Sequence, residues 1–383
     1  MVSPLRGKSA IVGVATAGFK GAPGREPIDL AAECGVKALA EAGLTTRDVD
    51  AVFGALPDDP LSVLGFAEYL GIKPKFMDNN RVGGSSFLTH TEIATMALEA
   101  GICDVALIYY GSCQKSKLGK LGAAVDNPRY EAHYKPIFPA TSYALAMSRH
   151  MHEFGTTPEQ FAEVAVAARK WANMNPEAVM QGPLSVDDVL SSRMVSEPLH
   201  VRDCCLVTDG GAAAVMVHKK RAKDFPKKPV YLLGSASATT HRNIAAMDNF
   251  VVSAAADSGK RAYAAAGLKP SDIDLVELYD AFTINTILFL EDLGFCKKGE
   301  GGAFIQSGAI NPGGTLPVNT NGGGLSCNHP GMYGMFTIVE AVRQLRGECG
   351  ERQVKGAEIA LSHGNGGVLS SQATNIWGTE STL

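Results

Sequence analysis

The sequence lacks the cysteine patterns that organise small secreted or zinc-binding proteins. Its eight cysteines are scattered and none belongs to a CxxC pair, so we expect buried free thiols and predict neither a disulfide framework nor a metal site. An excess of positive charge is also missing. The net charge of -4 at pH 7 leaves no basic footprint, which excludes nucleic acid as an expected partner.

Long apolar runs are absent as well. No stretch of about 18 apolar residues occurs, so we expect no membrane span. The first residues, MVSPLRGKSAIVGVATAG, lack the apolar core of a signal peptide, and we therefore expect a cytoplasmic protein. Hydrophobic residues make up 45% of the 383 residues and charged ones 19%, which argues against disorder. A chain of this length favours two domains or two fused halves.

The sequence does contain an internal repeat. The stretch from Ala31, AAECGVKALAEAGLTTRDVDAV, matches the stretch from Ala255, AADSGKRAYAAAGLKPSDIDLV, without a gap and at an offset of 224 residues (255 minus 31). Each copy reads as an alanine-rich helix ended by Gly43 or Gly267, then an aspartate-containing turn and a short apolar strand. A repeat of this kind could serve folding alone, but both halves also place a glycine-rich turn at the same point.

The repeat predicts the fold class. Strands that alternate with helices at this spacing indicate parallel βαβ units, with helices on both faces of the sheets. We expect an α/β fold of two repeated halves packed about a pseudo-twofold axis, residues 1–235 forming the first half and 236–383 the second. A region of about 115–200, rich in Tyr, Met, His and Pro, interrupts the first half and is expected to cover a ligand.

Glycine-rich turns at 82–86, 321–324 and 364–367 follow the predicted strands. In open α/β folds, ligands bind beyond the carboxyl ends of the strands, where helix N-termini offer unpaired N–H groups to an anion or a developing oxyanion. The three turns therefore predict a single binding site assembled from both halves. The expected binding residues are Gly83, Gly84, Ser85, Asn321, Gly323 and Gly366.

Two polar motifs accompany these turns. Tyr279, in the motif YDAF, ends a predicted strand, and His329, in the motif CNHP, follows the second glycine turn. Proline fixes the chain just after the histidine. A single Tyr or His at such a position is often a satisfied core residue. Because both coincide with the glycine turns, we treat them as candidate catalytic residues.

With these motifs, the sequence resembles the thiolase superfamily over nearly its whole length. NTNGG at 319–323, followed by His329 and Pro330, resembles the NxNGG…GHP signature, and YDAF resembles the NEAF or HDCF motif of the family. LEDLGFCKKGEGGAF, HPGMYG and HGNGGVLSSQA are most similar to sterol-carrier-type thiolases and thiolase-like steroid side-chain aldolases. The resemblance implies a thiolase fold, a CoA thioester as substrate with no bound cofactor, and a His329 that activates nucleophiles and helps hold the thioester oxygen.

Two departures from the thiolase pattern bear on the chemistry. Thiolases carry an acyl-accepting cysteine at the first glycine turn, but no cysteine lies between Cys34 and Cys103. They carry a second, proton-transferring cysteine in a CxG near the C-terminus, where this sequence has His363 and Gly364. Ping-pong thiolysis needs a covalent acyl-enzyme and is therefore disfavoured.

Retro-aldol cleavage of a β-hydroxyacyl-CoA suits the groups that remain. It needs a stabilised thioester enolate and proton transfer but no covalent step. In the aldolases that the chain resembles, tyrosines act as acid and base; the resemblance places one at Tyr279 and a second at or near Cys327. We therefore predict Tyr279, His329, Cys327 and His363 as catalytic residues, with Tyr333 as a further candidate for proton transfer.

Alternatives remain open. Cys327 could be a relocated nucleophile, in a thiolase or acyltransferase that cleaves a β-ketoacyl-CoA with CoA. Ser85 or Ser86 could act instead if a histidine lay within hydrogen-bond reach. The chain could also be a noncatalytic thiolase-like subunit. The resemblance further implies a homodimer, a small zinc-ribbon and OB-fold partner protein, and a role in lipid, steroid or aromatic degradation.

Overall fold

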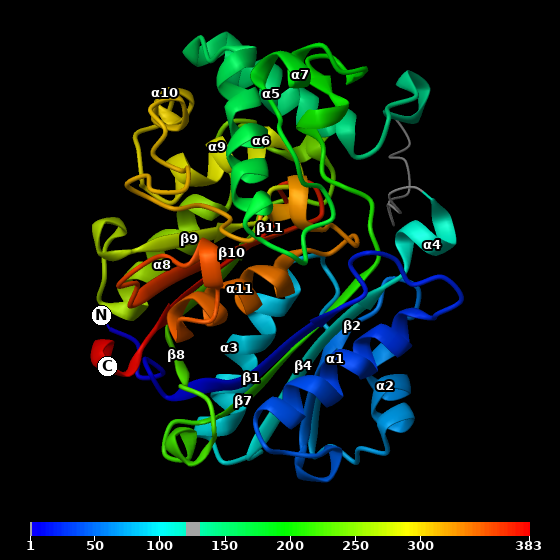
Figure 1. The fold of residues 1–383 in the computed structure, drawn as a ribbon, viewed down its shortest axis with the longest axis vertical. Coiled ribbons are helices and arrows are strands. Elements are labelled where there is room, and N and C mark those ends of the chain that lie inside the picture. Colours follow the sequence, from blue (N-terminus) through cyan, green and yellow to red (C-terminus); the bar gives the residue numbers. More distant parts are fainter. Residues whose placement is uncertain (1, 120–130) are drawn as a thin grey trace.

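A nine-stranded mixed sheet forms the framework of the molecule (Figure 1). The computed structural model describes residues 2–119 and 131–383. The strand order is β3-β2-β4-β7-β1-β8-β11-β10-β9. The strands of this sheet are β1 (Ser9–Ala17), β2 (Ala51–Ala55), β3 (Phe76–Asp78), β4 (Val105–Ser112), β7 (Gly210–His218), β8 (Val230–Thr239), β9 (Leu275–Leu278), β10 (Ile359–Gly366) and β11 (Ser371–Gly378).

Apart from the edge strand β3, the sheet has the same arrangement when it is followed inward from β2 and from β9. In one half β2 pairs with β4 in parallel, and β4–β7 and β7–β1 are antiparallel. In the other half β9 pairs with β10 in parallel, and β10–β11 and β11–β8 are antiparallel. The neighbouring central strands β1 and β8, one from each half, join the halves through a short antiparallel contact. The predicted α/β fold with two repeated halves is confirmed, although the sheet is mixed rather than wholly parallel.

The repeat holds at the level of single turns. The helices α1 (Pro27–Glu41) and α8 (Ala255–Ala266) are followed by Gly43 and Gly267, whose φ angles of +71° and +69° suit glycine and end the helices. Short 3-10 turns follow at Thr46–Asp48 and Pro270–Asp272, again 224 residues apart. Strands β2 and β9 come next. The sequence offset therefore describes equivalent positions in space.

Two central helices lie between the halves (Figure 1). Helices α3 (Ser85–Glu99) and α11 (Gly334–Arg346) contact each other and strands of both halves. Their N-terminal ends approach so closely that a Cβ on Gly334 would lie 2.0 Å from the carbonyl oxygen of Gly84. Both helices begin directly after a glycine-containing turn. The predicted site residues are thus brought to the place where the two halves meet.

A helical cap, drawn at the top of Figure 1, covers the side of the molecule that contains the N-terminal ends of α3 and α11. It packs on α9 (Thr283–Asp292) and α10 (Gly301–Gln306) of the second half, and a buried contact of 3.1 Å between His150 Nε2 and Glu291 Oε1 joins the two parts. The elements of the cap are α4 (Gln114–Leu118), α5 (Ala140–Phe154), α6 (Pro158–Asn173), α7 (Val186–Leu190) and the hairpin of β5 (Met194–Ser196) with β6 (Leu199–His200). Part of the predicted insertion, 120–130, lies outside the described residues.

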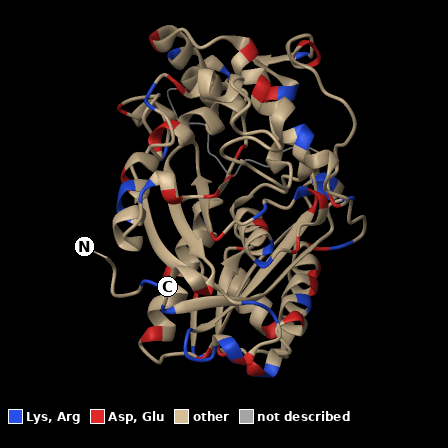
Figure 2. Ribbon diagram, turned by 60° about the vertical axis from the view of Figure 1, so that its left-hand side comes forward, with Lys and Arg blue, Asp and Glu red and all other residues tan. Residues whose placement is uncertain are grey.

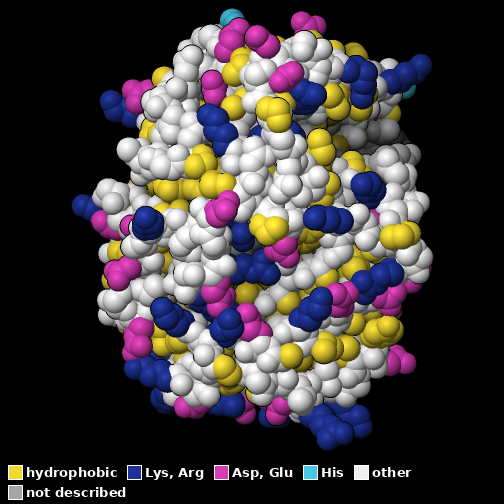
Figure 3. Space-filling model, in the orientation of Figure 1, with side chains coloured by type: hydrophobic (Ala, Val, Ile, Leu, Met, Phe, Trp, Pro, Cys, Tyr) yellow, Lys and Arg dark blue, Asp and Glu magenta, His cyan; other side chains and the backbone are white. Residues whose placement is uncertain are grey.

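Charged side chains lie mainly on the outer helices and loops, while the strands carry few (Figure 2). On the face drawn in Figure 3, both signs of charge are interspersed without a broad basic area. Among the residues that the structure describes, no helix is long and apolar enough to cross a bilayer. The division into halves at 235/236 stays a proposal; it falls within β8.

His90 is a buried histidine of α3 whose ring nitrogens form no hydrogen bond with any residue that the structure describes. Its nearest charged neighbour is Asp78, with 3.6 Å between Nε2 and the carboxylate oxygen. Burial lowers the pKa of His90 from 6.5 to about 3. The folded protein therefore excludes a proton that the unfolded chain binds below pH 6.5.

We expect the substitution His90→Leu to make stability less sensitive to acid. The contribution of His90 is complete above the unfolded pKa and is lost as the pH falls toward 3, so its removal should flatten the pH dependence. The expected change is about 1.4 kcal/mol in unfolding free energy per pH unit between pH 6 and 4. Urea unfolding at several pH values measures it, with His152→Leu on the exposed face of α5 as control. Parallel pH curves for His90→Leu and the wild type would contradict this assignment.

Candidate active site

A cleft of about 320 Å³ opens at the N-terminal ends of α3 and α11. Its size is that of a small-molecule site, and both halves and the cap contribute to its wall. The residues that line it are Pro57, Arg81, Val82, Gly83, Gln114, Pro139, Tyr143, Tyr279, Ala281, Phe282, His329, Gly331, Met332, Asn365, Gly367 and Val368. Its wall therefore combines an apolar surface with a few polar side chains.

Tyr279 and His329 form a hydrogen-bonded pair on the wall of the cleft. Tyr279 follows β9, and its hydroxyl lies 3.1 Å from His329 Nε2 and 2.8 Å from the carbonyl oxygen of Gly331. Burial raises the pKa of Tyr279 well above 10 and lowers that of His329 to about 4. Both groups are therefore neutral at pH 7. A neutral imidazole beside a phenol can accept a proton, and the phenol can relay one.

The first glycine turn makes room for this tyrosine. A Cβ on Gly84 would lie 2.4 Å from Cε1 of the Tyr279 ring, so only glycine allows the ring to pack here. Gly83 has a φ angle of +122° and pairs with Gly366 across the two halves. Because α3 begins at Ser85, the amides of its first turn have no partners within the helix and lie beside the cleft.

Asp280 shapes the loop that leads to His329. Its buried carboxylate accepts hydrogen bonds from the amides of Gly324 at 2.5 Å and Leu325 at 3.4 Å. Gly323 approaches so closely that a Cβ there would lie 2.0 Å from the carboxylate. Burial raises the pKa of Asp280 to about 7. The conformation of the NTNGG loop thus depends on this carboxyl group, which positions the histidine.

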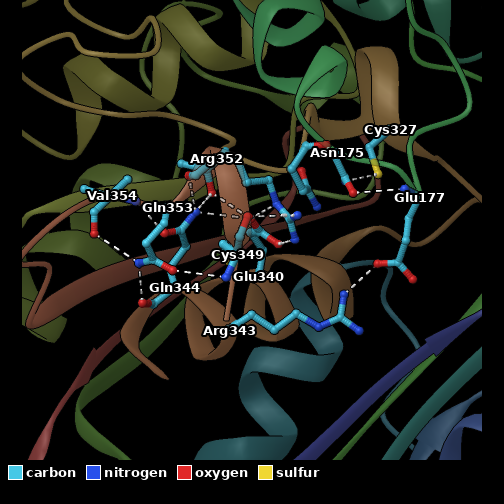
Figure 4. A network of polar contacts seen from close by, with 12 residues as sticks. Asn175, Glu177, Cys327, Glu340, Arg343, Gln344, Cys349, Arg352, Gln353 and Val354 are labelled. Atoms are coloured by element: carbon cyan, nitrogen blue, oxygen red, sulfur yellow. Dashed lines mark hydrogen bonds and ion pairs between the residues drawn. The ribbon is translucent and has the colours of Figure 1, made fainter. Parts of the chain in front are cut away.

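The structure does not bring Cys327 to the cleft. Its thiol is fully buried and receives a 3.5 Å contact from Asn175 Nδ2, at the edge of the polar network around Glu340 and Arg352 (Figure 4). Burial raises the pKa of this thiol well above 9, which opposes the nucleophilic thiolate form. Cys327 ends the π-helical turn at Gly323–Cys327, and its side chain is not part of the cleft wall.

Other expected site residues lie behind the cleft rather than in its wall. His363, on β10, is fully buried between Thr374 and Gln372, with contacts of 2.9 Å to each. Ser85 donates a hydrogen bond to Ser371 Oγ at 3.0 Å. No hydrogen bond joins Ser85 or Ser86 to a histidine within the described parts of the chain.

Asn321 and Gly323 also lie behind the wall of the cleft. Asn321 Oδ1 accepts from the amide of Gly323 at 2.7 Å and from the Tyr333 hydroxyl at 2.9 Å. Of the ten expected site residues, the structure therefore places Gly83, Tyr279 and His329 in the cleft wall. Gly84 and Gly366 support it directly. The prediction of one site from both halves describes the backbone better than the side chains, several of which turn into the core.

Sequence reasoning missed several residues of the cleft. Tyr143 enters from α5 of the cap and stacks on Phe282 at 4.3 Å between ring centroids. Asn365 lies within the third glycine turn, in which Gly366 is the residue that the sequence predicts to bind substrate. Arg81 donates hydrogen bonds to the carbonyl oxygens of Leu56 and Pro57. The aromatic content of the insertion was a signal for Tyr143, but nothing distinguished it from the neighbouring tyrosines.

The two-half fold and the site at the paired central helices define a thiolase-type enzyme. Residues 236–379 match the family model described as thiolase C-terminal domain-like. The chain is 35% identical over 372 residues to an acetyl-CoA acetyltransferase of Methanothermobacter thermautotrophicus, covering 91% of this chain and 94% of that protein. It is 36% identical over 369 residues to a steroid side-chain-cleaving aldolase of Thermomonospora curvata, covering 90% and 92%.

A solved structure titled Ltp2-ChsH2(DUF35) aldolase superposes on the chain with a TM-score of 0.88 at 34% identity, covering 98% of this chain and 99% of that one. The chain belongs to the thiolase superfamily, in the branch of sterol-carrier-type thiolases and side-chain aldolases. The expectations of a thiolase fold and of an enzyme acting on carbon–carbon bonds of acyl-CoA are confirmed.

Proposed function

We propose that this enzyme cleaves a β-hydroxyacyl-CoA by a retro-aldol reaction, which yields a ketone or an aldehyde and a shortened acyl-CoA. The observation that supports it best is the neutral Tyr279–His329 pair in a cleft whose wall contains no cysteine among the described residues. The open cleft in front of the pair argues against a noncatalytic subunit. Covalent thiolysis would need a thiol at this point.

The reaction begins at the β-hydroxyl group of the substrate. In the resting structure the Tyr279 O–H donates to the carbonyl oxygen of Gly331, and in this step it turns to His329 Nε2, 3.1 Å away, in the tautomer that leaves Nε2 unprotonated. Tyr279 then accepts the hydroxyl proton while its own proton passes to Nε2. The electrons of the O–H bond form the new carbonyl group, and the electron pair of the Cα–Cβ bond moves into the thioester enolate. A proton then adds to Cα. One proton is removed and one is supplied, so no oxidant or other co-substrate is needed.

The enolate oxygen requires hydrogen-bond donors that are already in place. Backbone amides at the Gly83 and Gly367 turns, which line the cleft from opposite halves, are suited to this role. Loss of one such donor typically costs about 10²–10³-fold in rate. We therefore assign Gly83, Gly84 and Gly366 to substrate binding, and leave Cys327 and His363 outside direct chemistry.

The CoA thioester is the substrate and we propose no resident cofactor. Phe282, Met332 and Val368 give the cleft an apolar surface that suits a steroid, aromatic or other hydrophobic acyl group. The names of the relatives include a steroid side-chain aldolase and a CoA lyase. We propose the same broad class of degradative substrate for this enzyme, and a cytoplasmic location.

We also propose two kinds of protein partner. Strand β3 is an edge of the sheet, and Leu61, Leu64 and Met77 are exposed on or near it, which suits pairing with a second copy in a homodimer. The related aldolase structure is titled with a DUF35 protein. By analogy we propose that a small zinc-ribbon and OB-fold protein of this kind assists the enzyme.

The function is tested with a panel of β-hydroxyacyl-CoAs and β-ketoacyl-CoAs, with and without such a partner, followed by mass spectrometry. We expect cleavage of a β-hydroxyacyl-CoA in the absence of free CoA. Cleavage restricted to β-ketoacyl-CoAs, with dependence on free CoA, would instead establish a thiolase. An acyl adduct on Cys327 would identify the relocated nucleophile.

A further inference from the structure

A second tyrosine lies in the same cleft and has no role in the chemistry described so far. Tyr143, on α5 of the cap, is 2% exposed and stacks on Phe282. Its hydroxyl oxygen accepts a hydrogen bond from Asn365 Nδ2 at 2.9 Å, and its O–H reaches the carbonyl oxygen of Gly367 only at 3.5 Å. Asn285 and the backbone of Leu369 also interact with this hydroxyl. Burial raises its pKa to about 12. Tyr143 is therefore a neutral phenol that holds its proton beside the cleft.

A buried chain of hydrogen bonds orients this phenol. Gln372 Nε2 donates to Asn365 Oδ1 at 2.7 Å, so Gln372 Oε1 is left to accept from His363 Nε2 at 2.9 Å. His363 Nδ1 then accepts from the hydroxyl of Thr374 at 2.9 Å. Every donor in this chain points toward the cleft. The last N–H belongs to Asn365 and is given to the oxygen of Tyr143.

The direction of this chain determines what Tyr143 can do. Its oxygen already receives a hydrogen bond at 2.9 Å, whereas its O–H meets Gly367 only at the 3.5 Å limit, and its contacts with Asn285 and Leu369 do not reach hydrogen-bond geometry. The proton is thus available to a bound ligand. Asn365 stabilises the oxygen more strongly if that oxygen becomes negative, because a hydrogen bond to a charged group is the stronger one.

We propose that Tyr143 is the acid that protonates Cα of the enolate. The inference rests on the proposed function, in which Tyr279 and His329 remove the hydroxyl proton and a separate donor must supply the proton at Cα. The O–H bond of Tyr143 breaks as the Cα–H bond forms, and the electron pair of the enolate becomes that C–H bond. This step leaves a phenolate at Tyr143 and an imidazolium at His329.

Transfer of one proton from His329 to Tyr143, through solvent that enters as the products leave, restores the neutral resting state. No other reactant is consumed. Asn365 is a positioning residue in this scheme, and His363 acts on it through Gln372. The buried histidine near the C-terminus thus gains a role in orientation rather than in proton transfer.

The test separates the step at Cα from the step at the β-hydroxyl. Propanoyl-CoA is incubated with the full-length enzyme in D₂O, and deuterium at Cα is followed by mass spectrometry. We expect Tyr143→Phe to reduce both this exchange and β-hydroxyacyl-CoA cleavage by about 100-fold, an ordinary contribution for acid–base catalysis. Tyr279→Phe should lose cleavage while it retains most of the exchange. The matched control is Tyr263→Phe; Tyr263 is a buried tyrosine of α8 whose hydroxyl has no hydrogen-bond partner in the described part of the chain.

Exchange and cleavage at wild-type rates in Tyr143→Phe would overturn the proposal and leave the aldolase function standing. Exchange that depends on Tyr143 in an enzyme without cleavage activity would support the Cα acid and overturn the aldolase function. A wild type that cleaves substrate but does not exchange propanoyl-CoA would also overturn the proposal. Melting temperatures verify that Tyr143→Phe is folded.

A second variant tests the orienting role of Asn365. In Asn365→Asp the carboxylate can only accept, so the Tyr143 O–H turns toward it and away from the ligand. We expect exchange to fall by at least about tenfold through kcat, with KM for acyl-CoA unchanged. A change confined to KM would assign Asn365 to substrate binding and overturn its positioning role.

Discussion

Replacing Tyr279 with phenylalanine is expected to lower kcat/KM for cleavage of a β-hydroxyacyl-CoA by about 10³-fold, within the 10²–10⁴-fold range of positioned acid–base groups. The hydroxyl is the group that connects the substrate to His329 Nε2, and phenylalanine cannot relay a proton. The ring itself remains, so its packing against Gly84 is kept and binding of acyl-CoA should change little. The measurement is steady-state cleavage together with the dissociation constant of a product acyl-CoA.

Stability distinguishes lost chemistry from a damaged fold in this variant. The hydroxyl of Tyr279 gives up its contacts with Gly331 and His329, at a cost of about 1 kcal/mol in unfolding free energy. Tyr263→Phe removes a buried hydroxyl that has no hydrogen-bond partner among residues 2–119 and 131–383, and it should keep full activity with equal or higher stability. A Tyr279→Phe enzyme with more than a tenth of wild-type activity would show that this hydroxyl is not the acid–base group.

The pH profile gives an independent check on His329. A base must be unprotonated to accept a proton, and burial lowers the pKa of this imidazole to about 4. The cleavage rate should therefore stay level down to about pH 5 and fall only below that. A decline centred near pH 6.5 that persists in Asp280→Asn, which lacks the carboxyl group with a pKa of about 7, would mean that the histidine is solvated during turnover.

The parts of this fold that the sequence predicts are the periodic ones. The 224-residue offset identifies equivalent turns at Thr46–Asp48 and Pro270–Asp272, because the conformation of a short turn is determined by residues adjacent in the sequence. The glycine turns locate the cleft for a similar reason: close backbone approach excludes a side chain. At Gly84 this requirement comes from the ring of Tyr279, which lies on the other half.

Side-chain direction is what the sequence left open. Cys327 and His329 are two residues apart, yet the thiol of Cys327 contacts Asn175 in the core while the imidazole of His329 faces the cleft. The π-helical turn at Gly323–Cys327 and its contact with Asp280 decide this, and neither is visible as a pattern. The position of Tyr143 in the cleft could not be predicted from the sequence either, because it results from the packing of the cap on the rest of the molecule.

A methyl group at Gly334 should abolish the folded state or reduce its stability by more than about 4 kcal/mol, a loss reserved for severe packing errors. The added Cβ would lie 2.0 Å from the carbonyl oxygen of Gly84 and 2.7 Å from its carbonyl carbon. These are backbone atoms, which cannot rotate away as a side chain could. Helices α3 and α11 would have to separate. The soluble yield and urea midpoint of Gly334→Ala measure the effect.

Gly65→Ala is the matched control for this substitution. Gly65 lies within α2 (Ser62–Leu70), and the nearest atom to an added Cβ is a carboxylate oxygen of Asp59 at 3.4 Å. Alanine should therefore stabilise the helix by up to about 1 kcal/mol. If Gly334→Ala proved as stable as Gly65→Ala, α3 and α11 would not meet as closely as described. Because the same turn at Gly84 also packs against Tyr279, any movement that relieves the clash must displace the catalytic tyrosine, so stability and activity should fail together.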